Sequence, residues 1–166
     1  MDTIKFIIED YVDTENGFRF PTINIYINER NLIDLVEEVE HERYSEEVAE
    51  TSTRCYVGLH PEYYRGFLNE FLGKPMHAFS ILLICTCLVA ECNCITAKII
   101  VNTDTVTWSE LRSPFLSSET PNPWITVEEA IAMDWCPIDY SVLGDFVFDR
   151  DQYMDALKEL RRNLDS

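Results

Sequence analysis

The stretch from Phe79 to Leu111, FSILLICTCLVAECNCITAKIIVNTDTVTWSEL, decides the fold of this protein. It opens with FSILLIC, an apolar run typical of a central strand that is buried on both faces. It closes with two strand-like runs, TAKIIVN and TVTWSEL, which surround the turn residues Asn102, Thr103 and Asp104. Such an arrangement predicts a tight hairpin. The stretch therefore predicts neighbouring antiparallel strands.

A second hairpin is predicted at the amino terminus. Residues 3–11, TIKFIIEDY, alternate apolar and polar or mixed side chains, and residues 22–28, TINIYIN, repeat the alternation with three isoleucines. A period of two is the pattern of a strand with one buried face. Asn16 and Gly17 form a turn dipeptide between the two segments, which favours a hairpin.

Helical spacing of apolar residues marks segments 28–42, 61–73 and 149–164, and Asp149 suits an N-cap. A capping box predicts a further short helix at 126–133. Nothing indicates a domain boundary or an internal repeat. The sequence therefore predicts one α+β domain over residues 1–166, with an antiparallel sheet of about five or six strands and helices packed mainly on one face.

Charge is the unusual feature of the composition. The 166 residues include 30 acidic and 13 basic side chains, a net charge of −17, while the hydrophobic content of 46% is ordinary for a globular protein. An excess of negative charge repels phosphate backbones, so direct nucleic-acid binding through a basic face is not expected. The same field attracts cationic partners and also favours solubility.

Neither a signal peptide nor a membrane span is expected. The first residues, MDTIKFIIEDYVD, lack a basic region followed by an apolar run, and the longest apolar stretch, AFSILLIC, is less than half the length of a membrane span. We therefore expect a cytoplasmic protein. In the cytoplasm the six cysteines stay reduced.

Four cysteines fall within ten positions and could form a zinc module centred on residues 85–94. If the intervening LVAE forms a four-residue loop, Cys87 opposes Cys92 and Cys85 opposes Cys94. The four thiols then share one face of a hairpin, and a closed set of thiolates suits zinc. Residues two apart on a flat strand lie roughly 6.5–7 Å apart, too far for neighbouring zinc ligands. Buried thiols packing as small apolar groups are therefore favoured over zinc, and no cofactor is expected. The candidate ligands are Cys85, Cys87, Cys92 and Cys94, with His77 as an alternative fourth ligand.

The sequence contains no phosphate-binding glycine loop, no G-x-S-x-G and no H-E-x-x-H. His41, His60 and His77 share no ligand spacing, and His60 stands before Pro61, where a role in a turn is at least as well supported as a functional one. We therefore predict a protein that is not an enzyme.

Acidic side chains are concentrated between residues 34 and 50. The first fifty residues hold fourteen acidic and four basic side chains. Charge concentrated on a helix and the loop after it can accelerate association with a basic surface, although a solvated helix face gives the same pattern. Aromatic residues in loop-like contexts can anchor such an interface. The predicted partner-binding residues are Asp34, Glu37, Glu38, Glu42, Glu46, Glu47, Tyr63 and Trp124.

The carboxyl-terminal half contains CTCLVAEC, ITAKIIVNTDTVTWSEL, WCPIDY and LGDFVFDRDQYMDAL in that order. These segments resemble a widespread family of small uncharacterised bacterial proteins with a C-x-C-G-x-x-G-C hairpin and a closing F-x-F-D-R-x-Q-Y motif. The hairpin glycines are missing here, and SPFL replaces the family's N-P-H-R segment. The resemblance matches Cys85, Cys87 and Cys92 but not Cys94. It implies a bacterial or phage-like cytoplasmic setting and no defined activity.

These observations predict a non-enzymatic acidic binding protein that neutralises a basic partner by occlusion, as an immunity protein or an inhibitor does. The partner would be a basic protein, such as a toxin or a nucleic-acid-binding effector. The alternative is the cysteine-rich zinc module.

Overall fold

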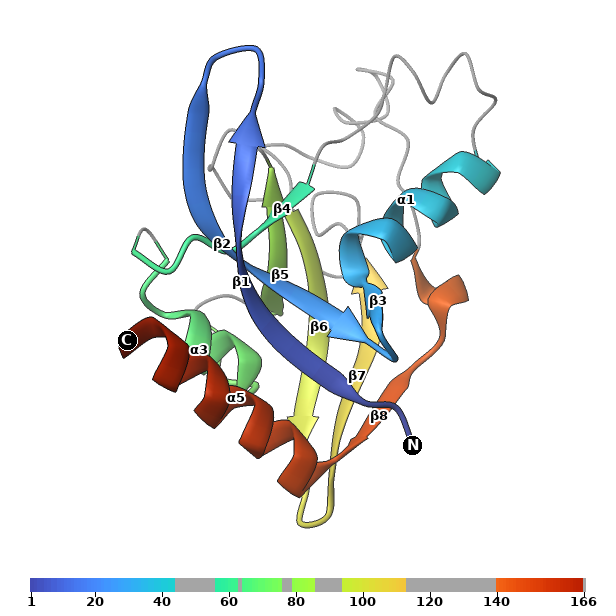
Figure 1. Cartoon of the computed structure of the whole chain (residues 1–166). Helices are drawn as coiled ribbons and strands as arrows, with labels where there is room; N and C mark the ends of the chain where they lie inside the picture. The colour runs from blue at the N-terminus through green and yellow to red at the C-terminus, as the bar shows by residue number, and fades with distance from the viewer. Residues whose placement is uncertain (44–55, 63, 76–78, 86–93, 113–139, 166) are drawn as a thin grey trace.

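The computed structural model describes residues 1–43, 56–62, 64–75, 79–85, 94–112 and 140–165. Its elements, drawn in Figure 1, are β1 (Ile4–Asp13), β2 (Phe18–Ile27), β3 (Arg30–Asn31), α1 (Leu32–Arg43), β4 (Tyr56–Gly58), α3 (Phe67–Phe71), β5 (Ser80–Cys85), β6 (Cys94–Val101), β7 (Thr105–Arg112), η2 (Ser141–Leu143), β8 (Phe146–Asp149) and α5 (Arg150–Asp165). The fold is mixed α+β with antiparallel strand pairing, as the sequence predicts.

The strands form two sheets, whereas the sequence analysis expected one. The first has the order β1-β2-β3 and the second the order β4-β5-β6-β7-β8. Both predicted hairpins are confirmed, because β1 pairs with β2 and β6 pairs with β7 in antiparallel register. The first hairpin takes the short β3 as its third strand. Among the described residues only isolated bridges, and no continuous ladder, link the hairpin to the five-stranded sheet, so the two sheets stay distinct. That the helices cover mainly one face stays a prediction.

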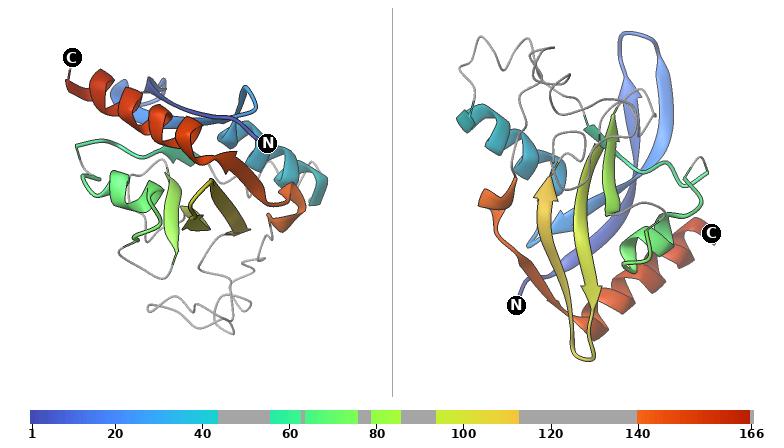
Figure 2. Two further views of the ribbon diagram at one scale, coloured as in Figure 1. Left: turned by 90° about the horizontal axis from the view of Figure 1, so that it is seen from below. Right: turned by 180° about the vertical axis from the view of Figure 1, so that it is seen from behind.

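The two sheets are joined at both edges. At one edge, the Ile23 amide of β2 donates to the Leu59 carbonyl oxygen just after β4 (2.8 Å). At the other edge, the Asp2 amide donates to the Val147 carbonyl oxygen of β8 (2.9 Å). Gly58 allows the first junction, because a Cβ atom there would lie 2.1 Å from the Ile23 carbonyl oxygen. The views in Figure 2 show β1 and β2 lying against the curled second sheet.

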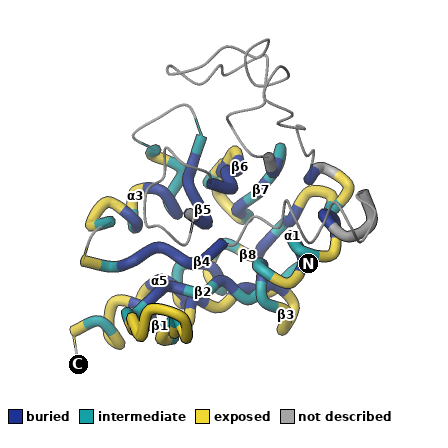
Figure 3. The backbone as a smooth tube through the Cα atoms, turned by 90° about the horizontal axis from the view of Figure 1, so that it is seen from above, coloured by how far each residue is buried: buried dark blue, intermediate teal, exposed yellow. Residues whose placement is uncertain are grey.

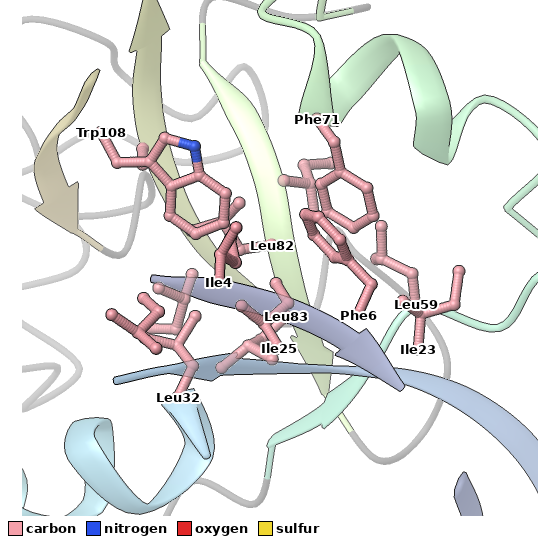
Figure 4. Packing of buried hydrophobic residues seen from close by; sticks show 14 of the residues in the cluster. Ile4, Phe6, Ile23, Ile25, Leu32, Leu59, Phe71, Leu82, Leu83 and Trp108 are labelled. Carbon is pink, nitrogen blue, oxygen red and sulfur yellow. The ribbon is translucent and has the colours of Figure 1, made fainter. Parts of the chain in front are cut away.

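Aromatic side chains from both sheets and the helices meet in one core (Figure 4). The rings of Phe6 on β1 and Phe71 on α3 lie 4.7 Å apart between centroids. Trp108 on β7 donates from Nε1 to the Tyr153 hydroxyl (3.1 Å), which in turn donates to the Phe71 carbonyl oxygen (2.6 Å). A strand of each sheet and two helices are thereby held by residues that no local pattern connects.

The carboxyl-terminal helix begins where the sequence predicts. Asp149 is its N-cap, and the carboxylate oxygen Oδ1 accepts from the backbone amides of Asp151 (3.0 Å) and Gln152 (3.2 Å). The apolar face of α5 is buried against the core. Its buried members are Tyr153, Ala156, Leu157 and Leu160.

The first helix is confirmed from Leu32 onward, whereas residues 28–31 of the predicted segment form a turn and the short β3. It begins at Leu32, where the Asn31 side-chain oxygen accepts from the Ile33 amide (2.9 Å). Its predicted apolar face is buried, so the helix cannot rotate without exposing this face to water. The buried members are Leu32, Leu35, Val36 and Val39.

The predicted helix over 61–73 is much shorter in the structure, where α3 spans Phe67–Phe71. His60 explains part of the difference. Its ring nitrogen Nδ1 accepts from the Glu62 amide (3.1 Å), which fixes a turn where the helix was expected to begin. The turn role expected for His60 is therefore confirmed. The short helix predicted at 126–133 lies outside the described residues.

Candidate interaction surface

Helix α1 presents carboxylates on the side opposite its buried apolar face. Asp34 and Glu38 are exposed, and Glu37 is half-buried. Arg30, on β3, forms an ion pair with Glu38 while both side chains stay about half exposed. Exposed ion pairs contribute roughly 0–1 kcal/mol, so a partner's cation could replace Arg30 at small cost. These residues make up the α1 acidic face, which we define as Asp34, Glu37 and Glu38.

Glu40 belongs to the same acidic run of sequence but has a different environment. It is buried, and its carboxylate accepts from the Tyr140 hydroxyl (2.7 Å). Burial, with the nearby Tyr56 hydroxyl and the Glu40 charge, raises the pKa of Tyr140 far above its usual value. The two hydrogen-bonded residues are one hundred positions apart. No sequence pattern links them, and sequence analysis missed the pair.

The Glu40–Tyr140 bond fixes the carboxyl-terminal part of α1 against the start of η2, while the apolar stripe fixes the rest of the helix. The α1 acidic face is therefore presented on a rigid support rather than on a free helix. A second buried carboxylate, Glu70, also has a structural partner, because its Oε2 accepts from the Ile81 amide (3.0 Å) and ties α3 to β5.

The structure describes only part of the predicted partner-binding set. Asp34, Glu37 and Glu38 are brought together on α1, as predicted. Glu42 falls within α1, but the structure describes only its backbone and not its side chain. The remaining predictions lie outside the described residues: Glu46, Glu47, Tyr63 and Trp124.

The cysteine cluster is described only at its two ends. Cys94 is buried, and its partner across the β5–β6 ladder is Ile84. The expected opposition of Cys85 and Cys94 is therefore wrong, because Leu83 pairs with Ile95 and Ile84 with Cys94, which is one residue away from the expected register. Cys85 instead stands opposite Tyr56 of β4.

The zinc alternative stays a prediction. Three of its candidate ligands, Cys87, Cys92 and His77, lie outside the described residues. Among the residues that are described, no group of three or more histidine, cysteine, aspartate or glutamate side chains is placed to hold a metal ion.

A further acidic feature lies on the face of the β1–β2 hairpin that is turned away from the core. Glu9 accepts from the Asn24 side-chain amide (3.0 Å) and from the Tyr26 hydroxyl (2.5 Å). The hydrogen bond to Glu9, with burial and the Glu9 charge, raises the pKa of Tyr26. Toward the turn of this hairpin, Val12 and Phe18 are exposed. Sequence analysis recognised the hairpin but did not identify it as a surface for a partner.

No protein-family model, no curated protein and no solved structure matches the chain. Within the described part of the chain, no helix is both long enough and apolar enough to cross a membrane. The bacterial family suggested by the sequence motifs stays a prediction.

Proposed function

We propose that this protein is a non-enzymatic acidic binding protein that neutralises a basic partner protein by occlusion, in the manner of an immunity protein or an inhibitor. The observation that carries the proposal is the α1 acidic face, which is exposed on a helix whose opposite side is buried. A cytoplasmic setting and a partner such as a toxin or a nucleic-acid-binding effector belong to the same proposal.

Electrostatic attraction would bring the partner to the α1 acidic face, which would then cover the partner's basic residues. The net charge of −17 draws a cationic protein toward the surface and raises the association rate, more strongly at low salt. On contact, Asp34 and Glu38 accept hydrogen bonds from lysine and arginine side chains that the partner would otherwise use for its own target. Because α1 is already held by its apolar stripe and by the Glu40–Tyr140 bond, little ordering is needed on binding.

The test separates a local site from diffuse charge. Hen lysozyme, ribonuclease A and cytochrome c, three basic proteins, are immobilised as probes, and binding is measured by surface plasmon resonance over a range of salt concentrations. One variant reverses two charges on α1, Asp34→Lys with Glu38→Lys. The matched variant reverses two exposed charges on α5, Asp155→Lys with Glu159→Lys. Both variants carry the same net charge.

We expect salt-sensitive binding to at least one probe and a loss on the order of tenfold in the association rate for the α1 variant. The α5 variant should lose much less. Equal losses in the two variants would show that the net charge alone attracts the probes and would overturn α1 as the site. Absence of binding to every probe at low salt would overturn the proposed recognition of basic proteins.

A further inference from the structure

The outer edge of β1 is closed at Ile4, near the start of the strand. The Ile4 amide donates to the side-chain oxygen of Gln152 on α5 (3.1 Å), and the Gln152 side-chain amide donates to the Ile4 carbonyl oxygen (2.7 Å). Both backbone groups of Ile4 therefore point away from β2. In an antiparallel pair the backbone groups of alternate residues point to the same side. Those of Phe6, Ile8, Asp10 and Val12 point outward as well.

The second half of this edge is open. Within the described part of the chain, the outward amides and carbonyl groups of Ile8, Asp10 and Val12 have no hydrogen-bond partner. Val12 is 47% exposed, and the side chain of Asp10 is 49% exposed. Figure 3 shows the turn end of the β1–β2 hairpin as exposed, in contrast to the buried course of β4 and β5. Unpaired backbone groups on an exposed strand are a template for another strand.

The opposite edge of the same hairpin is protected. The Ile23 amide of β2 is bonded to Leu59, and alternation places Pro21 next along this outward side. Proline has no amide hydrogen and cannot donate to a ladder. One edge of the hairpin is thus blocked while the other offers a row of donors and acceptors.

We propose that the open edge of β1, from Ile8 to Val12, binds an extended segment of a basic partner protein as an added strand. The identification of the partner as basic rests on the proposed function. Main-chain hydrogen bonds to Ile8, Asp10 and Val12 supply affinity, and side chains alternating along the added strand supply selectivity.

Charge selects a cationic segment over a second copy of this chain. Asp10 stands at the middle of the open edge, and Asp13 and Glu15 lie at the turn beyond it. The nearest basic group is Arg19, whose Nε lies 3.5 Å from the Asp10 carboxylate in an exposed pair. Such a pair exchanges readily with a partner's lysine. Two copies paired edge to edge about this point would place Asp10 beside Asp10, which is unfavourable.

The probe is a fluorescein-labelled nine-residue peptide of alternating valine and lysine, and binding is measured by fluorescence anisotropy at low salt. Its control has the same sequence with N-methyl groups on two adjacent central residues, which blocks both edges of the peptide without changing its charge. We expect the control to bind on the order of tenfold more weakly. Equal binding of the two peptides would show attraction by charge alone and would overturn strand addition.

Amide hydrogen exchange followed by NMR locates the contact in the unmodified protein. The bound peptide should slow exchange at Ile8, Asp10 and Val12, while Ile7 and Glu9, which face β2, should change little. Protection spread evenly over the surface, or protection elsewhere only, would overturn the proposal. This measurement requires no variant and does not depend on the folding of one.

Substitutions on the edge complete the test. Val12→Pro removes one outward amide that β2 does not use, so the fold should tolerate it, as edge strands tolerate proline. Val12→Thr retains the amide and is the matched control. We expect a loss on the order of tenfold in peptide binding for proline and a small change for threonine. Equal binding by both variants would count against the open edge as the site.

Failure of this inference is distinguishable from failure of the proposed function. One outcome is that the α1 variant loses binding to the probe proteins while Val12→Pro and peptide N-methylation have no effect. This outcome would preserve the proposed function and overturn strand addition. The reverse result would preserve the open edge and overturn the α1 acidic face. Sedimentation velocity that shows a salt-stabilised dimer lost in Val12→Pro would identify a second copy of the chain as the occupant and overturn the basic partner.

Discussion

The two halves of strand β1 pair with the same strand, β2, but they differ in burial and in the state of their outer edge. In the first half, Ile4 and Phe6 are buried, and Gln152 closes the outer edge at Ile4. In the second half, Asp10 and Val12 occupy the same face of the strand and are exposed, and none of the described residues pairs with the outer edge. The register with β2 is continuous through both halves, without a bulge. Strand formation therefore does not decide which half becomes surface.

What decides it is the packing of other elements. The carboxyl-terminal helix and α3 reach Phe6 through Tyr153 and Phe71, as the ring contacts show. Beyond the junction at Ile23 and Leu59, the hairpin extends past the second sheet (Figure 1). The same strand is a core element at one end and a potential binding element at the other.

The largest expected difference between the halves is in core packing. Phe6→Ala should lower the free energy of unfolding by about 3–5 kcal/mol, because it leaves a cavity beside Phe71 and Tyr153. Val12→Ala should change it by no more than about 0.5 kcal/mol. Urea denaturation monitored by tryptophan fluorescence measures both. Similar losses in the two variants would contradict the division of β1 into a buried and an exposed half.

The junction at which the hairpin leaves the second sheet should be the next most sensitive point. Gly58→Ala should destabilise the protein by about 2–3 kcal/mol, because the new Cβ would meet the Ile23 carbonyl oxygen unless the strands separate. Gly66→Ala is the control, since a Cβ there meets nothing within 4 Å. Thermal and urea unfolding of both variants tests this, and equal stability of the two would refute a tight junction.

Removing the Gln152 side chain should open the outer edge at Ile4, so that amide exchange there becomes similar to exchange in the second half of β1. Gln152→Ala should cost about 1–2 kcal/mol, because it leaves the Ile4 amide and carbonyl without their partner. Exchange of the Ile4 amide should accelerate toward the rate at Asp10. Asp155→Ala, an exposed substitution on the same helix, is the control. An Ile4 amide that stays protected in the Gln152 variant would show that other contacts close this edge.

The smallest effect concerns two tyrosines that each donate to a glutamate. Burial raises the pKa of Tyr140 in the folded state above its unfolded value of about 10. The protonated form is thus favoured by folding, so its stabilisation is intact below pH 10 and is lost as the pH rises. Stability should fall by about 1 kcal/mol per pH unit above pH 10. Tyr140→Phe should reduce this fall, as denaturant titrations at pH 9–11 can show.

Tyr26 provides the comparison within the same experiment. The pKa of Tyr26 is also raised, first by its hydrogen bond to Glu9, but Tyr26 is only partly buried on the outer face of the hairpin. Solvent screens this site, so Tyr26→Phe should change the alkaline loss of stability less than Tyr140→Phe does. If Tyr26→Phe changed the alkaline loss of stability more than Tyr140→Phe, the loss would arise mainly at the exposed face. That result would contradict its assignment to the buried Glu40–Tyr140 pair.

Much of the fold can be predicted from local sequence patterns. Alternating isoleucines predict β1 and β2, the run from Ile81 to Ile84 predicts a strand buried on both faces, and Asp149 predicts the start of α5. Each depends on residues within one or two turns of the chain, where periodicity and capping act. The α1 acidic face is predictable for the same reason, since helical spacing places Asp34 and Glu38 together.

Other features have no local signal. The Ile84–Cys94 pairing depends on a ladder irregularity that shifts the register by one residue. Buried Glu40 has its hydrogen-bond partner in Tyr140, and part of the shortening of α3 follows from the turn that His60 forms. The acidic run between residues 34 and 50 also includes Glu40, a carboxylate outside the predicted partner-binding set, and the tertiary structure removes it from the surface.

The sequence by itself determined the α+β class, the two hairpins, the two longer helices and the strongly acidic character of this protein. These properties arise from side-chain periodicity, turn residues and charge, which act over a few residues. Only the tertiary structure decided that the strands divide into two joined sheets, that Glu40 is buried, and that the outer edge of β1 is closed at Ile4 and open from Ile8 to Val12. Those outcomes depend on contacts between residues far apart in the chain, such as Gln152 with Ile4, and no local pattern encodes them.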